Sequence, residues 1–289
     1  MPTRQSSDGL LMIGHGTLES SGVADFFQIV EQVEGLLPQV PVQGCFLELA
    51  APNIASGVRA LHEKGVRWIR AVPLLLFAAA HVRRDIPEAL AAARAENPGV
   101  EIQQCNHLGC HPKIVELSSQ RCREVLAAQP NCPVQETLLI LVGRGSRDKR
   151  ATQEMHDFAE LRRQATPAVD VRVAFLAMER PRLDEVLRWA ATAGVRRVVV
   201  QPHLLFPGCL VDQVRAAVSH VRKEYPSVEW VVVGSLGRDR RIAEAIASLA
   251  TRGMDRQNRV HVSSVSEGQL AGSNPPDQQS DLVSGWISG

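Results

Sequence analysis

The chain has 289 residues, 45% hydrophobic and 22% charged, which is typical of a globular protein with a substantial core rather than of a disordered chain. Its 32 Lys and Arg against 31 Asp and Glu leave a net charge of +1, which argues against a general nucleic-acid-binding protein. No apolar run is long enough to span a bilayer, and residues 1–8 lack the pattern of a secretory signal. We therefore expect a two-domain protein without nucleic-acid or membrane partners.

Short apolar runs alternate with amphipathic stretches along the first half. We expect strands at 9–13, 40–47, 68–77 and 100–104, and helices at 21–37, 54–64, 84–94 and 112–128. Strands that alternate with helices of this length form β-α-β units, which build a parallel sheet covered by helices on both faces. The apolar run at 72–77 also fits a strand buried on both faces. The expected fold class is therefore α/β.

The second half of the sequence repeats the first at a nearly constant distance. Four segments recur 129 positions later: 14–17 as 143–146, 46–52 as 175–181, 65–67 as 194–196, and 73–77 as 202–206. Identical residues at the turns of both halves indicate a tandem duplication of one α/β domain. We expect the first copy at 9–130, the second at 134–252, and a linker at 131–133.

The segment 253–289 differs from both copies. It is rich in Ser, Gly, Gln and Asp and shows no sustained periodicity. Such a composition buries too little apolar surface to offset the entropy of ordering. We expect a disordered tail at 253–289 and a flexible N-terminus at 1–8.

Six cysteines are spread along the sequence with no C-x-x-C pair among them. A chain of this length needs no disulfides to be stable, and no export signal is recognisable. This predicts reduced thiols and a cytoplasmic location.

Three ionisable residues of the first copy lie near the carboxyl ends of expected strands, where parallel α/β sheets bind ligands. His15 follows the first strand, Glu48 ends the second, and His81 lies four residues beyond the third. Two imidazoles and a carboxylate that converge from separate strands can hold a divalent transition metal and leave coordination positions open. The imidazoles can also accept protons near neutral pH.

The second copy provides an internal control for these three positions. It has Arg144, Ala177 and Cys209 there, although it keeps the surrounding glycines, the Phe-Leu pair, the proline and the Leu-Leu-Phe run. The fold therefore needs the scaffold residues in both copies, but it does not need the His/Glu/His set. Each residue taken alone fits an ordinary turn or loop position, whereas the three together favour a functional site in the first copy.

The sequence resembles the class II tetrapyrrole chelatases of the sirohydrochlorin cobaltochelatase and ferrochelatase family. The resemblance covers roughly residues 9–250 and is carried by 15–17, 46–48 with Pro52, 73–76 running into His81, 85–87, and 108–112. It implies two tandem flavodoxin-like, chelatase-type domains, with metal at His15 and His81 and with Glu48 as their acidic catalytic partner. Because the second copy departs at all three positions, one functional site is expected in each chain.

The resemblance also implies the reaction: ATP-independent insertion of Co²⁺ or Fe²⁺ into sirohydrochlorin, in a cobalamin or siroheme pathway. The metal would be a substrate, with no permanently bound cofactor, and the chain would act as a monomer with a pseudo-dimeric domain pair. Insertion removes two pyrrole N–H protons and the metal's water shell, and a neutral histidine near the macrocycle can take protons.

A flat tetrapyrrole that carries carboxylates calls for apolar contacts and cations. The expected substrate contacts in the first copy are Leu76, Phe77, Ala78, Ala79, Ala80, Arg83 and Arg84. The apolar run among them fits a plain strand end equally well.

The charge is unevenly divided between the copies, with 11 basic and 13 acidic residues in 1–133 against 19 and 14 in 134–253. The first loop of the second copy is crowded with the cations Arg144, Arg147, Lys149 and Arg150. We hypothesise that they form a polyanion-binding wall that faces the first copy, although most charged runs are only solvated surface.

Two other functions stay open. The main alternative is a non-catalytic tetrapyrrole or metal carrier on the same fold, because the second copy shows how easily the His/Glu/His set is lost. A metal-dependent hydrolase would need a water-activating base beyond Glu48.

The remaining histidines and cysteines give weaker signals. A structural metal site is conceivable where ligand residue types gather, at Cys105, His107, Cys110 and His111, but their spacing matches no zinc finger or ribbon. The histidines interpreted as ordinary are His62, His156, His203, His220 and His261.

Overall fold

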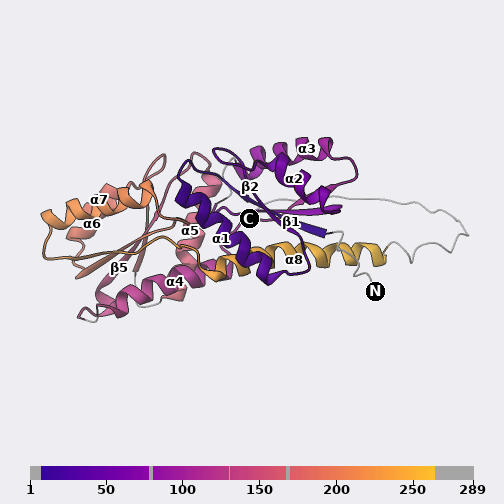
Figure 1. Cartoon of the computed structure of the whole chain (residues 1–289). Helices are drawn as coiled ribbons and strands as arrows, with labels where there is room; N and C mark the ends of the chain where they lie inside the picture. Colours follow the sequence, from indigo (N-terminus) through magenta and orange to yellow (C-terminus); the bar gives the residue numbers. More distant parts are fainter. Residues whose placement is uncertain (1–7, 78–80, 130, 167–169, 264–289) are drawn as a thin grey trace, which may run out of the picture. The chain divides into compact units, whose positions relative to one another are not determined.

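The computed structural model describes residues 8–77, 81–129, 131–166 and 170–263, except the side chains of residue 81 and of residues 252–263 (Figure 1). It contains one four-stranded parallel sheet in each copy, with strand orders β2-β1-β3-β4 and β6-β5-β7-β8. The equivalent order confirms the predicted pair of tandem α/β folds. Within the described residues, no helix is both long enough and apolar enough to cross a membrane.

The elements of the two copies correspond closely. The first copy comprises β1 (Asp8–Gly14), α1 (Ser20–Leu36), β2 (Val42–Phe46), α2 (Ile54–Glu63), β3 (Trp68–Pro73), the π-helical turn η1 (His81–Asp85), α3 (Ile86–Glu96), β4 (Glu101–Gln104) and α4 (Pro112–Ala127). The second comprises the 3-10 turn η2 (Val134–Glu136), β5 (Thr137–Gly143), α5 (Lys149–Ala165), β6 (Asp170–Phe175), α6 (Leu183–Thr192), β7 (Arg197–Pro202), α7 (Cys209–Glu224), β8 (Glu229–Val232) and α8 (Arg240–Ser263).

Some boundaries differ from those expected. β3 ends at Pro73 instead of Phe77, because its neighbour β1 ends at Gly14 and leaves the following residues without a pairing strand. The regular helix α3 begins at Ile86, two residues late, because the π-helical turn η1 precedes it. The backbone of α8 continues to Ser263, beyond the point where the periodic pattern ends.

Each sheet is covered by two helices on each face. Along β1, Leu11 and Ile13 pack with α2 and α3, whereas Leu10 and Met12 face the shared cluster that includes α1. In the second copy, α6 and α7 cover one face and α5 lies on the other. The last helices of the two copies are exchanged: α8 runs along the first sheet, and α4 runs along the second, where Ser118 accepts hydrogen bonds from Arg162 of α5 and Gln201 of β7 (Figure 1). Burial on both faces explains why the strands read as near-continuous apolar runs.

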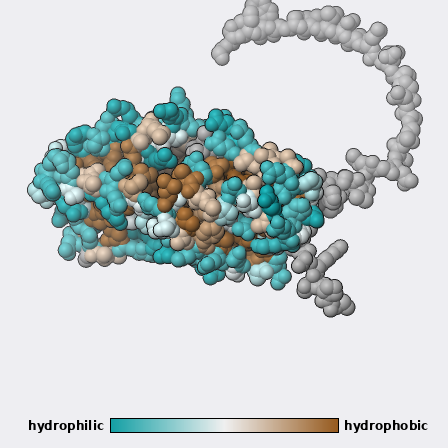
Figure 2. Space-filling view, turned by 45° about the horizontal axis from the view of Figure 1, so that its top comes forward, coloured by the Kyte–Doolittle hydropathy of each residue, from teal (hydrophilic) through white to brown (hydrophobic). Residues whose placement is uncertain are grey.

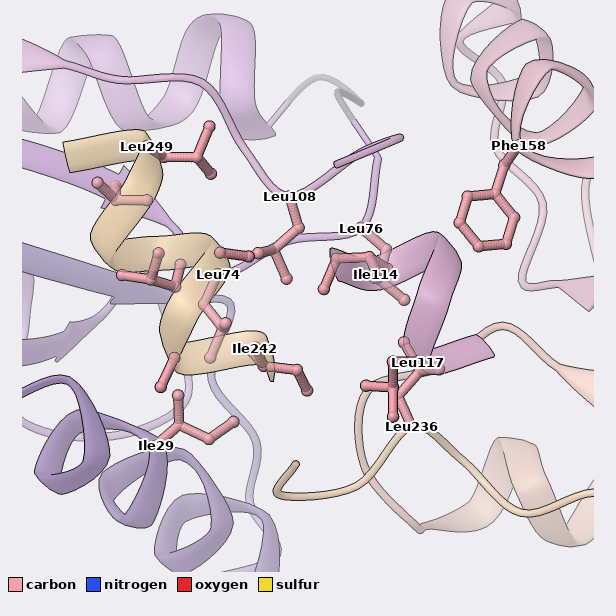
Figure 3. Close-up of a cluster of buried hydrophobic side chains, with 14 of the residues drawn as sticks. Ile29, Leu74, Leu76, Leu108, Ile114, Leu117, Phe158, Leu236, Ile242 and Leu249 are labelled. Atoms are coloured by element: carbon pink, nitrogen blue, oxygen red, sulfur yellow. The ribbon is translucent and has the colours of Figure 1, made fainter. Parts of the chain in front are cut away.

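The two copies share one hydrophobic core. A single cluster of buried side chains joins Ile29 of α1 and Leu117 of α4 to Phe158 of α5 and to Ile242 of α8, and Figure 3 shows part of this cluster. Each fully buried Leu, Ile or Phe contributes about 1.5–3 kcal/mol. Both copies accordingly belong to one compact unit.

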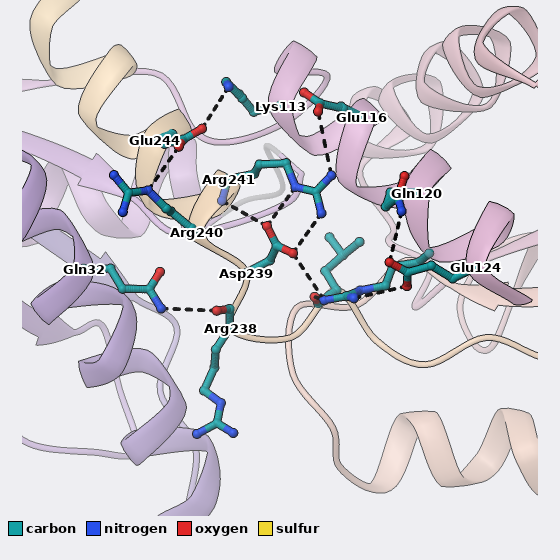
Figure 4. Close-up of polar contacts among 12 residues, drawn as sticks. Gln32, Lys113, Glu116, Gln120, Glu124, Arg238, Asp239, Arg240, Arg241 and Glu244 are labelled. Atoms are coloured by element: carbon teal, nitrogen blue, oxygen red, sulfur yellow. Dashed lines mark hydrogen bonds and ion pairs between the residues drawn. The ribbon is translucent and has the colours of Figure 1, made fainter.

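Ion pairs reinforce this shared core at its edge (Figure 4). Asp239, just before α8, accepts hydrogen bonds from Arg241 at 2.8 and 2.9 Å and lies 3.4 Å from Arg121 of α4. Lys113 of α4 lies 2.8 Å from Glu244 of α8. The hydrogen bond from Arg241 is the main reason that the pKa of Asp239 is lowered. These contacts tie the last helix of one copy to the last helix of the other.

A buried histidine lies beside the shared core. The His203 ring stacks on Phe158 with a centroid distance of 4.0 Å and lies 5.2 Å from the Phe77 ring. It is 1% exposed, and neither of its ring nitrogens has a hydrogen-bond partner among the described residues. Burial lowers the pKa of His203 to about 3, so the ring stays neutral over the physiological range.

We expect His203 to make the fold sensitive to acid. An unfolded chain takes up a proton here near pH 6.5, whereas the folded chain does so only near pH 3. As pH falls through this window, His203 therefore lowers the free energy of unfolding by about 1.4 kcal/mol per pH unit. His203→Leu should remove this dependence, so the stability difference between variant and wild type should grow in the variant's favour from pH 7 to pH 5 in urea denaturation.

Val58→Ala provides the control for this experiment, because it removes buried apolar volume from a cluster separate from the residues that pack around His203. It should lower stability by an amount that does not depend on pH. Parallel stability curves for wild type and His203→Leu would contradict the prediction.

Candidate functional site

The loops that follow β1 and β2 meet at the carboxyl edge of the first sheet. Glu48 N–H donates to the His15 carbonyl at 3.1 Å, and Leu47 N–H donates to the Gly14 carbonyl at 2.9 Å. These backbone bonds bring the side chains together, with His15 Nε2 3.3 Å from Glu48 Oε1. The side chains of His15 and Glu48 are 30% and 48% exposed, so a ligand can reach both.

A glycine permits this close approach. Gly16 has a φ of +101°, and a Cβ placed on it would lie 1.7 Å from the Glu48 carbonyl oxygen. Gly145 has the same geometry in the second copy, with a φ of +89° and a distance of 1.7 Å to the Ala177 carbonyl oxygen. Only glycine fits at either turn, which explains why both copies keep this residue while the neighbouring functional positions differ.

The third predicted residue is only partly described. His81 begins η1 in the connection from β3 to α3, and β3 pairs with β1, so this connection leaves the same edge of the sheet as the loop of His15. The His81 side chain lies outside the described part of the chain, as do Ala78, Ala79 and Ala80.

A cavity of about 570 Å³ adjoins His15 and lies between the two copies. The first copy contributes His15, Thr17, Glu19, Leu75, Leu76 and Phe77 to its lining. The second copy contributes all the other lining residues, mainly from the loops that follow β5 and β7 and from the helices that these loops enter. Two of the predicted substrate contacts, Leu76 and Phe77, therefore lie in the same cavity as His15.

Large apolar side chains are exposed around the His15–Glu48 pair. Leu18 is 84% exposed, Leu49 is 55% exposed, and Met178 of the cavity lining is 56% exposed. In Figure 2, hydrophobic surface gathers toward the middle of the face in view. Exposed apolar side chains next to a polar pair are typical of a ligand-binding surface.

The predicted arginines Arg83 and Arg84 are not in the lining of this cavity, and both are engaged by carboxylates. Arg83 Nη2 donates to Asp148 Oδ2 at 2.7 Å, and Arg84 Nε donates to Asp85 Oδ1 at 3.0 Å. Arg144 and Arg147 are exposed and line the cavity, and neither has an ion-pair partner among the described residues. Of the four cations in the hypothesised wall, these two face the cavity, whereas Lys149 and Arg150 begin α5 outside its lining.

The cysteine and histidine cluster of the first copy serves structural contacts instead. In the described part of the chain, no group of three or more His, Cys, Asp or Glu side chains is placed to hold a metal ion. His107 Nε2 lies 3.1 Å from Glu154 Oε2, and His111 Nδ1 accepts from Lys113 N–H at the start of α4. A second cavity, of about 660 Å³, lies along β4 and α3, and neither His15 nor Glu48 is in its lining.

The sequence analysis interpreted His203 as an ordinary histidine, whereas the structure places it in the cavity lining. Its position corresponds to Leu74 in the first copy, so a polar residue at a buried apolar position was the signal that could have singled it out.

A family model and two curated relatives match most of the chain. The CbiX family model matches residues 9–125 and again residues 138–252. A sirohydrochlorin ferrochelatase of Priestia megaterium is 30% identical over 231 residues, which cover 80% of this chain and 84% of the relative. A sirohydrochlorin cobaltochelatase of the same organism is 25% identical, over 85% of this chain and 80% of the relative.

A solved structure shares the fold. SirB from Bacillus subtilis with Fe³⁺ superposes with a TM-score of 0.78 at 24% identity, over 86% of this chain and 98% of that chain.

Proposed function

The chain belongs to the CbiX family, and from this premise we propose that it is a sirohydrochlorin chelatase, which inserts Co²⁺ or Fe²⁺ into sirohydrochlorin without ATP. The cobalamin and siroheme pathways are the two that would use such a product. The observation that carries the proposal is the His15–Glu48 pair, accessible and 3.3 Å apart, beside a largely apolar cavity. Such a cavity suits a flat macrocycle, and the pair suits the metal and the protons.

Metal insertion requires side chains that hold the incoming metal and side chains that accept the pyrrole protons. A divalent metal replaces two pyrrole protons, so each turnover must remove two protons and release the metal's water. We propose that His15 and His81 hold the incoming metal through neutral imidazoles. When the metal passes to the ring nitrogens, the freed imidazoles accept the pyrrole protons. Glu48 lies 3.3 Å from His15 Nε2 and holds the orientation of that ring.

Both copies would serve this single site. We propose that the chain acts as a monomer with a pseudo-dimeric domain pair, because the shared core joins the copies within one chain. The metal enters and leaves as a substrate. A cytoplasmic location stays a prediction from the sequence.

Anaerobic incubation with sirohydrochlorin and Co²⁺, Fe²⁺ or Ni²⁺ in turn tests the proposed function. The change in the absorption spectrum of the macrocycle should be faster with the protein than without it for at least one metal. Binding of sirohydrochlorin without acceleration by any metal would favour the carrier function instead.

A further inference from the structure

We propose that the second copy binds the carboxylates of the tetrapyrrole through Arg144 and Arg147. The inference rests on the proposed function, because it names the side chains that hold the substrate in front of His15. It gives the second copy a role in the reaction even though that copy lacks the His/Glu/His set.

The position of the two arginines is the first argument. They lie in the loop between β5 and α5, the counterpart of the loop that carries His15, and Arg144 stands at the position equivalent to His15. Both loops line the same cavity. The duplication has therefore set a cationic loop and a histidine loop at one ligand-sized space.

The pairing of charges is the second argument. The carboxylates of the cavity lining are Asp148 and Glu19. Asp148 is engaged by Arg83 at 2.7 Å and caps α5 by accepting from Arg150 N–H at 3.0 Å. Arg144 and Arg147 have no ion-pair partner in the described part of the chain, so their guanidinium groups are available to a ligand.

The surroundings of Arg144 and Arg147 differ from those of arginines on an ordinary solvated surface. On α6 and α7, Arg188 and Arg215 each pair with an acid on their own helix, Asp184 and Asp212. Arg144 and Arg147 instead border a cavity with apolar side chains such as Phe77 and Phe206 in its lining. A low-dielectric wall strengthens the attraction of a cation for a carboxylate, and a guanidinium can hold a carboxylate through two hydrogen bonds.

Steady-state kinetics of the double variant Arg144→Gln/Arg147→Gln tests the proposal. The KM for sirohydrochlorin should rise at least tenfold, with kcat within about twofold and the KM for the metal unchanged, because substrate docking alone is removed. Arg188→Gln/Arg215→Gln is the matched control, because it removes the same charge from exposed positions outside the cavity. It should leave all three constants unchanged.

Several outcomes would overturn the proposal. An unchanged KM in the cavity variant would remove the two arginines from substrate binding. An equal rise of the KM in both double variants would assign the effect to net charge.

Compared with the glutamine variant, Arg144→Lys/Arg147→Lys should restore part of the affinity for sirohydrochlorin, since the charge is kept and only the paired hydrogen bonds are lost.

Direct titration of metal-free sirohydrochlorin separates this inference from the proposed function. If the protein binds the macrocycle but accelerates no insertion, the titration still measures the arginines: weaker binding by the cavity variant supports the proposal, and equal binding contradicts it.

Discussion

Replacing His15 with alanine should lower the rate of metal insertion by about 10²–10⁴-fold, the range that a positioned acid–base group contributes. His15 supplies both a metal ligand and a proton acceptor in the proposed reaction, so its loss removes two functions at once. His81→Ala should have a comparable effect. Glu48→Gln should have a smaller one, because the imidazole remains and only its carboxylate partner, 3.3 Å away, is lost. The measurement is the initial anaerobic rate with saturating metal.

His220→Ala is the control for removal of a histidine, because His220 is exposed on α7 and lies outside the cavity lining. It should insert metal at the wild-type rate. Full activity in both His15→Ala and His81→Ala would show that neither imidazole takes part in the reaction.

Gly16→Ala, which adds one methyl group, should have the second-largest effect among these substitutions, on both stability and the rate of insertion. The new Cβ would lie 1.7 Å from the Glu48 carbonyl oxygen, and a φ of +101° is unfavourable for alanine. The loop that joins His15 to Glu48 must therefore shift. We expect Gly16→Ala to lower the free energy of unfolding by more than about 3 kcal/mol and to reduce kcat at temperatures where the variant is still folded.

The second copy contains the matched variant. Gly145→Ala meets the Ala177 carbonyl oxygen at the same 1.7 Å, so its cost in stability should be similar. Its effect on function should differ, because the displaced loop carries Arg144 rather than His15, and we expect a higher KM for sirohydrochlorin instead of a lower kcat. Wild-type stability in either variant, measured by urea denaturation, would contradict the steric argument.

The sequence predicted the α/β fold well because each strand is buried on both faces and reads as an apolar run. It also predicted the duplication, since the turns of both copies must keep the same glycines and prolines. The sequence overestimated the length of β3, because the end of a strand depends on where its neighbouring strand stops. The run at 72–77 is apolar throughout, yet β1 gives no pairing partner beyond Gly14.

The candidate site was predictable to the extent that it follows from strand ends. His15 and Glu48 were expected to converge because β1 and β2 are parallel neighbours, and they lie in contact. Local sequence could not reveal that Arg83 pairs with Asp148, 65 positions away in the other copy. The same limit applies to His203, whose burial against Phe77 and Phe158 depends on how the copies pack.

In the proposed reaction the two copies form a single site, with the reacting groups in the first copy and the docking arginines in the second. Titration of the full chain with metal-free sirohydrochlorin, followed by absorption or fluorescence, tests this claim most directly. We expect one macrocycle bound per chain, with weaker binding when Arg144 and Arg147 are both replaced by glutamine. Two macrocycles per chain would show that each copy has a site of its own, and a single shared site would then be ruled out.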